Sequence, residues 1–140
     1  MQLQVQKLHP DAKMPVFAHD TDAGLDLCTV ADVTIEAGQR VQIPVGLAFA
    51  IPDGYVGLMW DKSGVSTKRG LKIFGGVIDA GYRGEIFVGL YNMGDTSQTF
   101  SVGDKISQIV IQKVEHPTLV AVESLEETER GDGAFGSTGK

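Results

Sequence analysis

Short stretches in which apolar and polar residues alternate recur along most of this chain, with turn-forming residues between them. The stretches that read as strands are 3–5, 25–29, 41–45, 47–51, 55–60, 71–74, 86–91, 105–114 and 118–122. Turn signals separate several of them, at 36–39, 52–54, 92–95 and 102–104. Many short strands at close spacing are typical of a β-sandwich, a jelly roll or a barrel. The sequence therefore predicts an all-β, jelly-roll-like fold, with a single helical turn at 65–68, after Ser63-Gly64.

Length and composition agree with one globular domain. The chain has 140 residues, of which 42% are hydrophobic and 21% charged, and its 18 glycines favour a turn-rich β protein. A net charge of −6 argues against a stable nucleic-acid partner, because such binding needs a basic surface. We expect no membrane span, because no apolar run approaches the length needed, and no signal peptide, because the N-terminus lacks a basic region followed by an apolar run. The single cysteine, Cys28, cannot form an internal disulfide, so we expect a cytoplasmic protein.

The C-terminal region 123–140 differs from the rest of the chain. It is acidic and glycine-rich with few apolar residues, so it cannot bury itself, and a disordered terminus is the commoner fate of such a tail. Phe135, however, stands among glycines, with the hydroxyls of Ser137 and Thr138 after it and Arg130 before it. This composition suits a segment that folds over a ligand. We expect a β domain at 1–122 and, at 123–140, an arm that closes an active site.

The segment 76–85 has the composition of a β-hairpin tip with a chemical role. Asp79 precedes the ring of Tyr82 by three residues, and the cation Arg83 follows the ring directly. A carboxylate that can activate water, a ring to pack on and an exposed hairpin backbone could together hold a nucleoside. The alternative is an ordinary hairpin whose Asp and Gly residues only make the turn.

Three further clusters lie at expected strand ends or turns. Asp26 interrupts an apolar alternation and either faces a site or points to solvent. Ser63 and Gly64 follow Lys62 just before the helical turn, which suits an anion cradle, the alternative being a plain helix cap at Ser63. Gln108 stands in an apolar strand and belongs either to a site or to the outer face of the sheet.

Five motifs, taken in order, resemble those of the trimeric deoxyuridine triphosphate nucleotidohydrolases (dUTPases). They are Ala-Gly-Leu-Asp-Leu at 23–27, Lys-Ser-Gly at 62–64, Gly-Val-Ile-Asp-Ala-Gly-Tyr-Arg-Gly-Glu at 76–85, Gly-Asp-Lys-Ile-Ser-Gln at 103–108 and Arg-Gly-Asp-Gly-Ala-Phe-Gly-Ser-Thr-Gly at 130–139. The third and fifth motifs are specific, and the others would be weak alone. The chain departs from the family pattern at Lys62 and Lys105, where arginine is usual, at Ala134, where glycine is usual, and at Ile73, where many relatives carry an asparagine near the uracil.

The resemblance implies a jelly-roll-like homotrimer that hydrolyses dUTP to dUMP and pyrophosphate, with the arm of one subunit closing a neighbour's site. Such an enzyme limits uracil incorporation into DNA and supplies dUMP. Asp79 would activate the water that attacks the α-phosphorus, and Asp26 would hold Mg²⁺ through water. The substrate-binding residues would be Lys62, Ser63, Gly64, Val77, Ile78, Tyr82, Phe87, Gln108, Arg130, Phe135, Gly136, Ser137 and Thr138.

Two alternatives stay open. One is a nucleotide enzyme like the dCTP deaminases, which share the fold but not the hairpin and tail motifs. The other is a non-catalytic trimer of the same fold that binds nucleotide and regulates a protein partner. Intact Asp79, Tyr82 and Phe135 favour the hydrolase without excluding a second, regulatory role.

Overall fold

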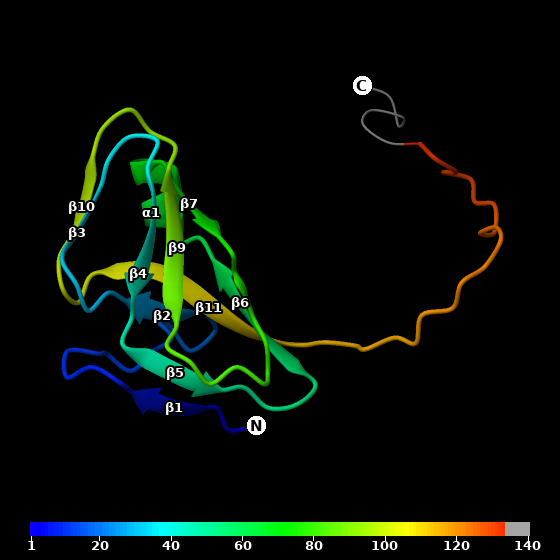
Figure 1. The fold of residues 1–140 in the computed structure, drawn as a ribbon, viewed down its shortest axis with the longest axis horizontal. Coiled ribbons are helices and arrows are strands. Elements are labelled where there is room, and N and C mark those ends of the chain that lie inside the picture. Colours follow the sequence, from blue (N-terminus) through cyan, green and yellow to red (C-terminus); the bar gives the residue numbers. More distant parts are fainter. Residues whose placement is uncertain (134–140) are drawn as a thin grey trace.

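The protein is built almost entirely from antiparallel strands. The computed structural model describes residues 1–133. Within them eleven strands form four sheets, and there is one short helix (Figure 1). The all-β, jelly-roll-like class is thereby confirmed, although the strands form four separate sheets and not one closed barrel. Among these residues no helix is long and apolar enough to cross a bilayer.

The two largest sheets carry the segments with candidate chemistry. The four-stranded sheet has the order β2 (Leu25–Cys28), β11 (Lys105–Lys113), β6 (Tyr55–Trp60) and β8 (Val77–Ile78). The three-stranded sheet has the order β4 (Arg40–Pro44), β9 (Phe87–Asn92) and β7 (Leu71–Phe74). The smaller sheets pair β1 (Gln4–Lys7) with β5 (Leu47–Ala50), and β10 (Gln98–Phe100) with β3 (Val33–Ile35).

One hydrophobic core lies between the sheets, because alternate residues of each strand point inward. Leu27, Ile43, Leu47, Leu90 and Ile109 are each no more than 1% exposed, and they come from five different strands. Cys28 is buried next to this core, and burial raises the pKa of its thiol.

The predicted hairpin forms, but its connection leaves the sheet. β7 and β9 pair from Leu71 with Asn92 to Phe74 with Gly89. Between them the chain crosses to the other large sheet, where β8 pairs with β6. This crossing carries the segment 76–85 along the border between the two sheets, where a pocket can form.

The single helix, α1 (Ser63–Arg69), is slightly longer than the turn predicted at 65–68. It ends at Gly70, whose φ of 67° is left-handed and whose N–H donates to carbonyls of the last turn. Arg69 lies 3.9 Å from the ring centroid of Phe100 and also donates to Gln98 and Thr99 of β10. These contacts of its last residue anchor α1 to β10, and the short helix in turn limits how far its first residues can move.

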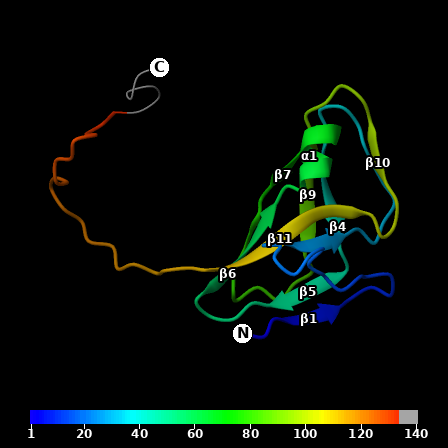
Figure 2. The same cartoon turned by 180° about the vertical axis from the view of Figure 1, so that it is seen from behind.

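The strand predicted at 118–122 is wrong for the single chain. β11 ends at Lys113, and the residues that follow are exposed, with Leu119 at 90% and Val120 at 76%. In both views the segment from the end of β11 to residue 133 runs away from the body of the protein (Figures 1 and 2). A β-prone segment forms a strand only beside a free edge, and here the chain leads it away from every edge of its own sheets.

Candidate active site

A pocket of about 300 Å³ opens where the connection between β7 and β9 crosses between the two large sheets. Its walls are formed by Gln42, Met59, Gly75, Val77, Ile78, Asp79, Tyr82, Glu85, Ile86 and Phe87. Five of these were predicted as site residues from the sequence: Val77, Ile78, Asp79, Tyr82 and Phe87. The pocket has the size and the mixed polar and apolar lining of a small-molecule site.

Tyr82 is held in place by its own turn. Its hydroxyl donates to the carbonyl of Glu85 at 2.9 Å, and its N–H donates to the carbonyl of Asp79 at 3.1 Å. The ring lies so close to Gly84 that a β-carbon there would come within 2.6 Å of Cζ. Only glycine permits this approach, which leaves the ring 45% exposed as one wall of the pocket.

Asp79 presents an exposed carboxylate beside that ring. Within residues 1–133 its side chain makes no hydrogen bond or ion pair, so its lone pairs are available to a ligand or a water molecule. A second hollow is also lined by Asp79, together with Tyr55, Ala80 and His116 among others. Asp79 therefore borders two hollows.

Asp26 lies in a second group of predicted residues and is neither a solvent-facing strand residue nor an open ligand. Its side chain is 4% exposed, with Oδ1 2.7 Å from Lys62 Nζ and Oδ2 2.6 Å from Lys105 Nζ. Burial raises the pKa of Asp26, but its contacts with Lys105 and Lys62 outweigh burial and hold the pKa below its usual range. The same contact raises the pKa of Lys105.

Gln108 joins this second group. Cross-strand pairing puts Asp26 opposite Gln108 and Gln108 opposite Trp60, so the three side chains share one face of the sheet. Gln108 Nε2 donates to the carbonyl of Asp61 at 2.8 Å. Gly24 makes room for it, since a β-carbon there would come within 2.9 Å of Gln108 Cδ.

The start of α1 completes the group. Lys62 occupies the cap position in extended conformation, and no side chain caps the helix. A plain cap at Ser63 is therefore wrong, because Ser63 is the first helical residue. Ser63 and Gly64 are both exposed, next to the Lys62 ammonium. Exposed N–H groups, a hydroxyl and a cation at one place suit an anion such as phosphate.

The pocket around Asp79 and the second group, which we call the cation group (Asp26, Lys62, Lys105, Gln108 and the start of α1), are separate within one chain. Ile78 pairs with Gly57 of β6, whereas Gln108 pairs with Trp60, three residues further along. At the rise of a strand this spacing corresponds to about 10 Å along β6, with β6 itself between the two partners. Asp79 and the cation group therefore lie apart on the surface of a single subunit.

Of the remaining predicted residues, the structure describes only Arg130, and it joins neither group. It is exposed in the arm and donates to the carbonyl of Gly133 at 3.0 Å. Phe135, Gly136, Ser137 and Thr138 lie outside the described residues.

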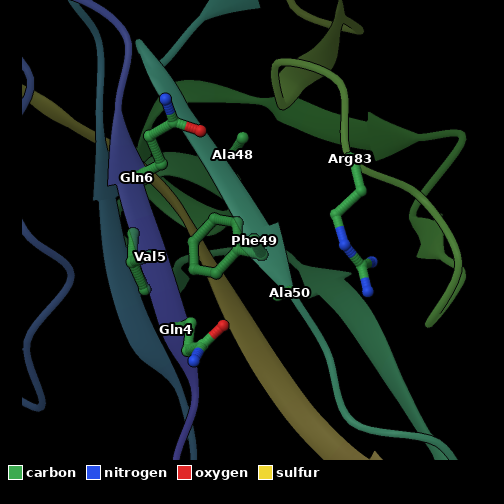
Figure 3. A pocket seen from close by; sticks show the side chains of 7 residues that line it. All are labelled: Gln4, Val5, Gln6, Ala48, Phe49, Ala50 and Arg83. Carbon is green, nitrogen blue, oxygen red and sulfur yellow. The ribbon is translucent and has the colours of Figure 1, made fainter.

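Arg83 points away from the nucleoside-sized pocket. It donates to the carbonyls of Ala80 and Tyr82 and forms one wall of a separate hollow at the pair β1 and β5. Figure 3 shows Arg83 across that hollow from Gln4, with Phe49 between them. The cation next to Tyr82 in the sequence is thus a turn-stabilising residue in this chain.

Sequence reasoning missed five of the ten pocket residues, namely Gln42, Met59, Gly75, Glu85 and Ile86. Glu85 was inside a recognised motif, and its Oε1 accepts from the Gly46 N–H at 3.1 Å, which ties the turn to β5. Gln42 and Met59 come from β4 and β6, and nothing in their local sequence marks them.

An all-β scaffold with a ring-and-carboxylate pocket and a group of cations around a helix start defines a nucleotide-binding class of protein. A sequence model of the family described as dUTPase matches residues 10–139. The chain is 46% identical over 142 residues to the deoxyuridine 5'-triphosphate nucleotidohydrolase of Rhodococcus erythropolis, covering 99% of this chain and 87% of the relative. It is 47% identical over 146 residues to the enzyme of the same name from Mycolicibacterium gilvum, covering 98% and 94%.

Solved structures agree with the sequence comparison. The dUTPase of Staphylococcus bacteriophage 80alpha with dUPNHPP superposes with a TM-score of 0.93 at 35% identity, over 99% of both chains. A mutant dUTPase of phage phi11 of S. aureus, described as coordinating a structural Mg(II) ion, superposes with a TM-score of 0.85 at 33% identity, over 91% of this chain and 100% of that one. The protein therefore belongs to the dUTPase family.

Proposed function

We propose that this protein is a dUTP diphosphatase, which hydrolyses dUTP to dUMP and pyrophosphate. The observation that carries the proposal is the pocket in which Asp79 and Tyr82 stand side by side on a rigid turn, in a chain of the dUTPase family. The pocket supplies a base and a sugar-sized apolar wall. The Asp26–Lys62–Gln108 group supplies cations and donors for a triphosphate.

Asp79 acts as the general base. Its exposed carboxylate takes a proton from the water that attacks the α-phosphorus, and the leaving group is pyrophosphate. The oxygen of that water bonds to phosphorus as the bond to the bridging oxygen breaks, so dUMP carries the new oxygen. Phosphoryl transfer depends mainly on positioning and charge stabilisation. The protein therefore needs only one well-placed base, to take the proton from the attacking water.

Tyr82 selects the deoxyribose. The contact with Gly84 and the hydroxyl bond to Glu85 keep the ring from moving aside. A sugar packed on this ring has no space for a 2′-hydroxyl, so UTP is rejected. We expect backbone groups of the turn to read the uracil edge, and Val77, Ile78 and Phe87, which line the pocket, to exclude a methyl at C5.

The phosphates bind at the start of α1. Lys62, Ser63, Gly64 and Gln108 supply an ammonium, N–H groups, a hydroxyl and an amide within a short stretch of surface. Lys62 serves as a point charge, because it lacks the two-pronged geometry with which arginine binds a phosphate. Its exposure of 31% leaves the ammonium accessible to an incoming phosphate while it still neutralises Asp26.

The residues around Asp26 fit Mg²⁺ only in an outer-sphere role. Within residues 1–133 no three carboxylate, histidine or cysteine side chains gather as a metal site, and both Asp26 oxygens face lysines. One carboxylate reached through water is nevertheless enough where the triphosphate itself provides inner ligands. When bound, Mg²⁺ would neutralise charge on the phosphate oxygens, and Asp26 would orient its hydration shell.

The active unit is a homotrimer with sites between subunits. Three observations support this assembly. First, the base and the cation group lie apart in one chain, whereas the base must reach water next to a phosphate that those cations hold. Second, Trp60 and Val77 are 53% and 64% exposed and share the outer sheet face with Leu58 and Val110. An exposed apolar sheet face beside a site is typical of a subunit contact. The region 114–133 also leaves the body, as a segment bound for a neighbouring subunit must.

The arm closes the site. We propose that Phe135 of one subunit stacks over the uracil of another, with Arg130, Ser137 and Thr138 on the phosphates and Gly136 allowing close approach. Closure excludes water other than the nucleophile and completes the charge stabilisation. The cytoplasm is the location we propose, on the ground that the only cysteine makes no disulfide within the chain.

The test is a substrate panel with an isosteric variant. Wild-type protein with Mg²⁺ should convert dUTP to dUMP and pyrophosphate and leave dCTP, dTTP and UTP nearly untouched. Asp79→Asn should bind dUTP but turn it over about 10²–10⁴-fold more slowly, because it lacks the base. Deamination of dCTP by the wild type, or near-normal turnover by the variant, would refute the assignment.

A further inference from the structure

We propose that Asp61 is a positioning residue for the phosphate-binding group, one that acts through its own backbone and through Gln108. Asp61 itself is not proposed to contact the substrate. The inference rests on the proposed function, since it assumes that Lys62 and Gln108 hold the triphosphate. The residue stands at the junction of β6, α1, β7 and β11.

The carboxylate of Asp61 fixes the neighbouring strand. Oδ1 accepts the backbone N–H of Ile73 at 2.8 Å, and Oδ2 forms an ion pair with Lys72. The side chain of Asp61 is 20% exposed, so most of the carboxylate that accepts this hydrogen bond is shielded from water. A hydrogen bond between a carboxylate and a backbone N–H is among the stronger kinds in proteins.

The backbone of Asp61 fixes the phosphate ligands. Its carbonyl accepts from Gln108 Nε2 at 2.8 Å, which sets the direction of the Gln108 amide. The next residue is Lys62, whose ammonium lies 2.7 Å from Asp26. Only Asp61 and Lys62 separate the end of β6 from the start of α1. A shift of Asp61 therefore moves Lys62, Gln108 and the first N–H groups of the helix together.

The bond to Ile73 should matter more than the ion pair. The Lys72 side chain is 49% exposed, and exposed ion pairs contribute little because water and salt screen them. The Ile73 N–H belongs to a half-buried residue whose position is fixed by its pairing with Leu90 of β9. The β7 strand is thus a rigid reference to which Asp61 attaches the phosphate-binding segment.

The experiment compares two ligands that use different parts of the site. The non-hydrolysable α,β-imido analogue of dUTP uses the nucleoside pocket and the phosphate group, whereas dUMP uses mainly the pocket. Calorimetry on the full-length protein gives Kd for each with Asp61→Ala, Asp61→Leu, Asp61→Asn and Lys72→Met. The leucine variant fills the volume of Asp without an acceptor and serves if the alanine variant unfolds.

In Asp61→Ala and Asp61→Leu, which lack the acceptor, Kd for the imido analogue should rise by about tenfold or more, the effect of one charge-assisted hydrogen bond. Kd for dUMP should change by less than about twofold. Asp61→Asn should stay close to wild type, because its amide oxygen can still accept from Ile73. Lys72→Met should also stay close to wild type. The ratio of the two Kd values is the readout, because general destabilisation would weaken both ligands alike.

Two results would overturn the proposal. One is an unchanged ratio of the two Kd values in the alanine and leucine variants, whether neither ligand or both ligands lose affinity, and the other is a loss in Asp61→Asn as large as in Asp61→Ala. A wild-type protein that binds neither ligand would instead refute the proposed function. The two failures are thereby distinguishable.

Discussion

Replacing Gly24 by alanine should damage both stability and phosphate binding, although it adds only one methyl group. The ideal position of that methyl lies 2.9 Å from Cδ and 3.1 Å from Cβ of Gln108. The amide end can rotate away, but only by giving up the bond from Nε2 to the carbonyl of Asp61. Gln108 Cβ cannot rotate away, because β11 is paired on both sides at this residue.

The cost follows from these two contacts. Overpacking at a site that cannot relax costs about 1–3 kcal/mol. Loss of the Gln108 hydrogen bond adds about 1 kcal/mol. The sum is about 2–4 kcal/mol, which for a chain of this size corresponds to a fall in Tm of roughly 6–12 °C.

Thermal unfolding at one fixed protomer concentration measures the effect, because the stability of an oligomer depends on concentration. Gly81→Ala is the matched control, since a β-carbon there meets nothing within 4 Å and its φ is not left-handed. It should unfold within about 2 °C of wild type, as surface substitutions do. Titration with the imido analogue of dUTP should show weaker binding for Gly24→Ala.

A double variant gives the sharpest check. Gln108→Ala removes the atoms that the new methyl would meet, apart from Cβ, so Gly24→Ala should cost much less in that background than in wild type. The difference between the two costs is the coupling energy of the pair. Equal costs in both backgrounds, or a single variant as stable as Gly81→Ala, would refute the packing argument.

Three further outcomes are expected. Replacing Tyr82 by alanine should raise the activity on UTP relative to dUTP by at least about tenfold, because it opens space at C2′, and an unchanged ratio in steady-state assays would contradict the steric argument. Deleting 131–140 should leave a folded oligomer with little activity, and mixing it with Asp79→Asn chains should restore some, whereas no recovery after confirmed subunit exchange would mean that the arm does not close a neighbour's site. The folded-state pKa of Asp26 is lowered, so its carboxylate stabilises the protein above the unfolded-state pKa of about 3.9 and this contribution is lost as pH falls through the folded-state value. Urea unfolding of wild type and Asp26→Asn should therefore differ at pH 7 and converge below about pH 4, and a gap that stays constant with pH would contradict the linkage.

The candidate site could be predicted from the sequence where its residues are close in the chain. Asp79 and Tyr82 are three residues apart on a turn whose glycines are visible in the sequence, and the structure places both at one pocket. Strands with clear alternation, such as those expected at 55–60 and 105–114, formed at Tyr55–Trp60 and Lys105–Lys113. Local patterns suffice in these cases because the period of side chains and the conformation of a turn are local properties.

Other features depended on contacts that no local pattern encodes. The pairing of β8 with β6 carries the hairpin connection to a second sheet, and two residues are too short a strand to show a period. Gln42 and Met59 reached the pocket only because β4 and β6 border it. The strand expected at 118–122 did not form, because a segment with β-propensity needs the edge of a neighbouring strand to pair with.

The sequence by itself determined the all-β class, the hairpin with its carboxylate and ring, and the family to which the chain is related. Only the tertiary structure decided that Asp26 is a buried carboxylate between Lys62 and Lys105, and that Asp61, the residue before Lys62, is hydrogen-bonded to Ile73 of β7. The physical reason is that strand periodicity fixes which face a side chain takes, whereas burial and charge pairing depend on the register between strands distant in the chain. That register is set by the packing of the whole core, and it is what turns scattered polar residues into a site.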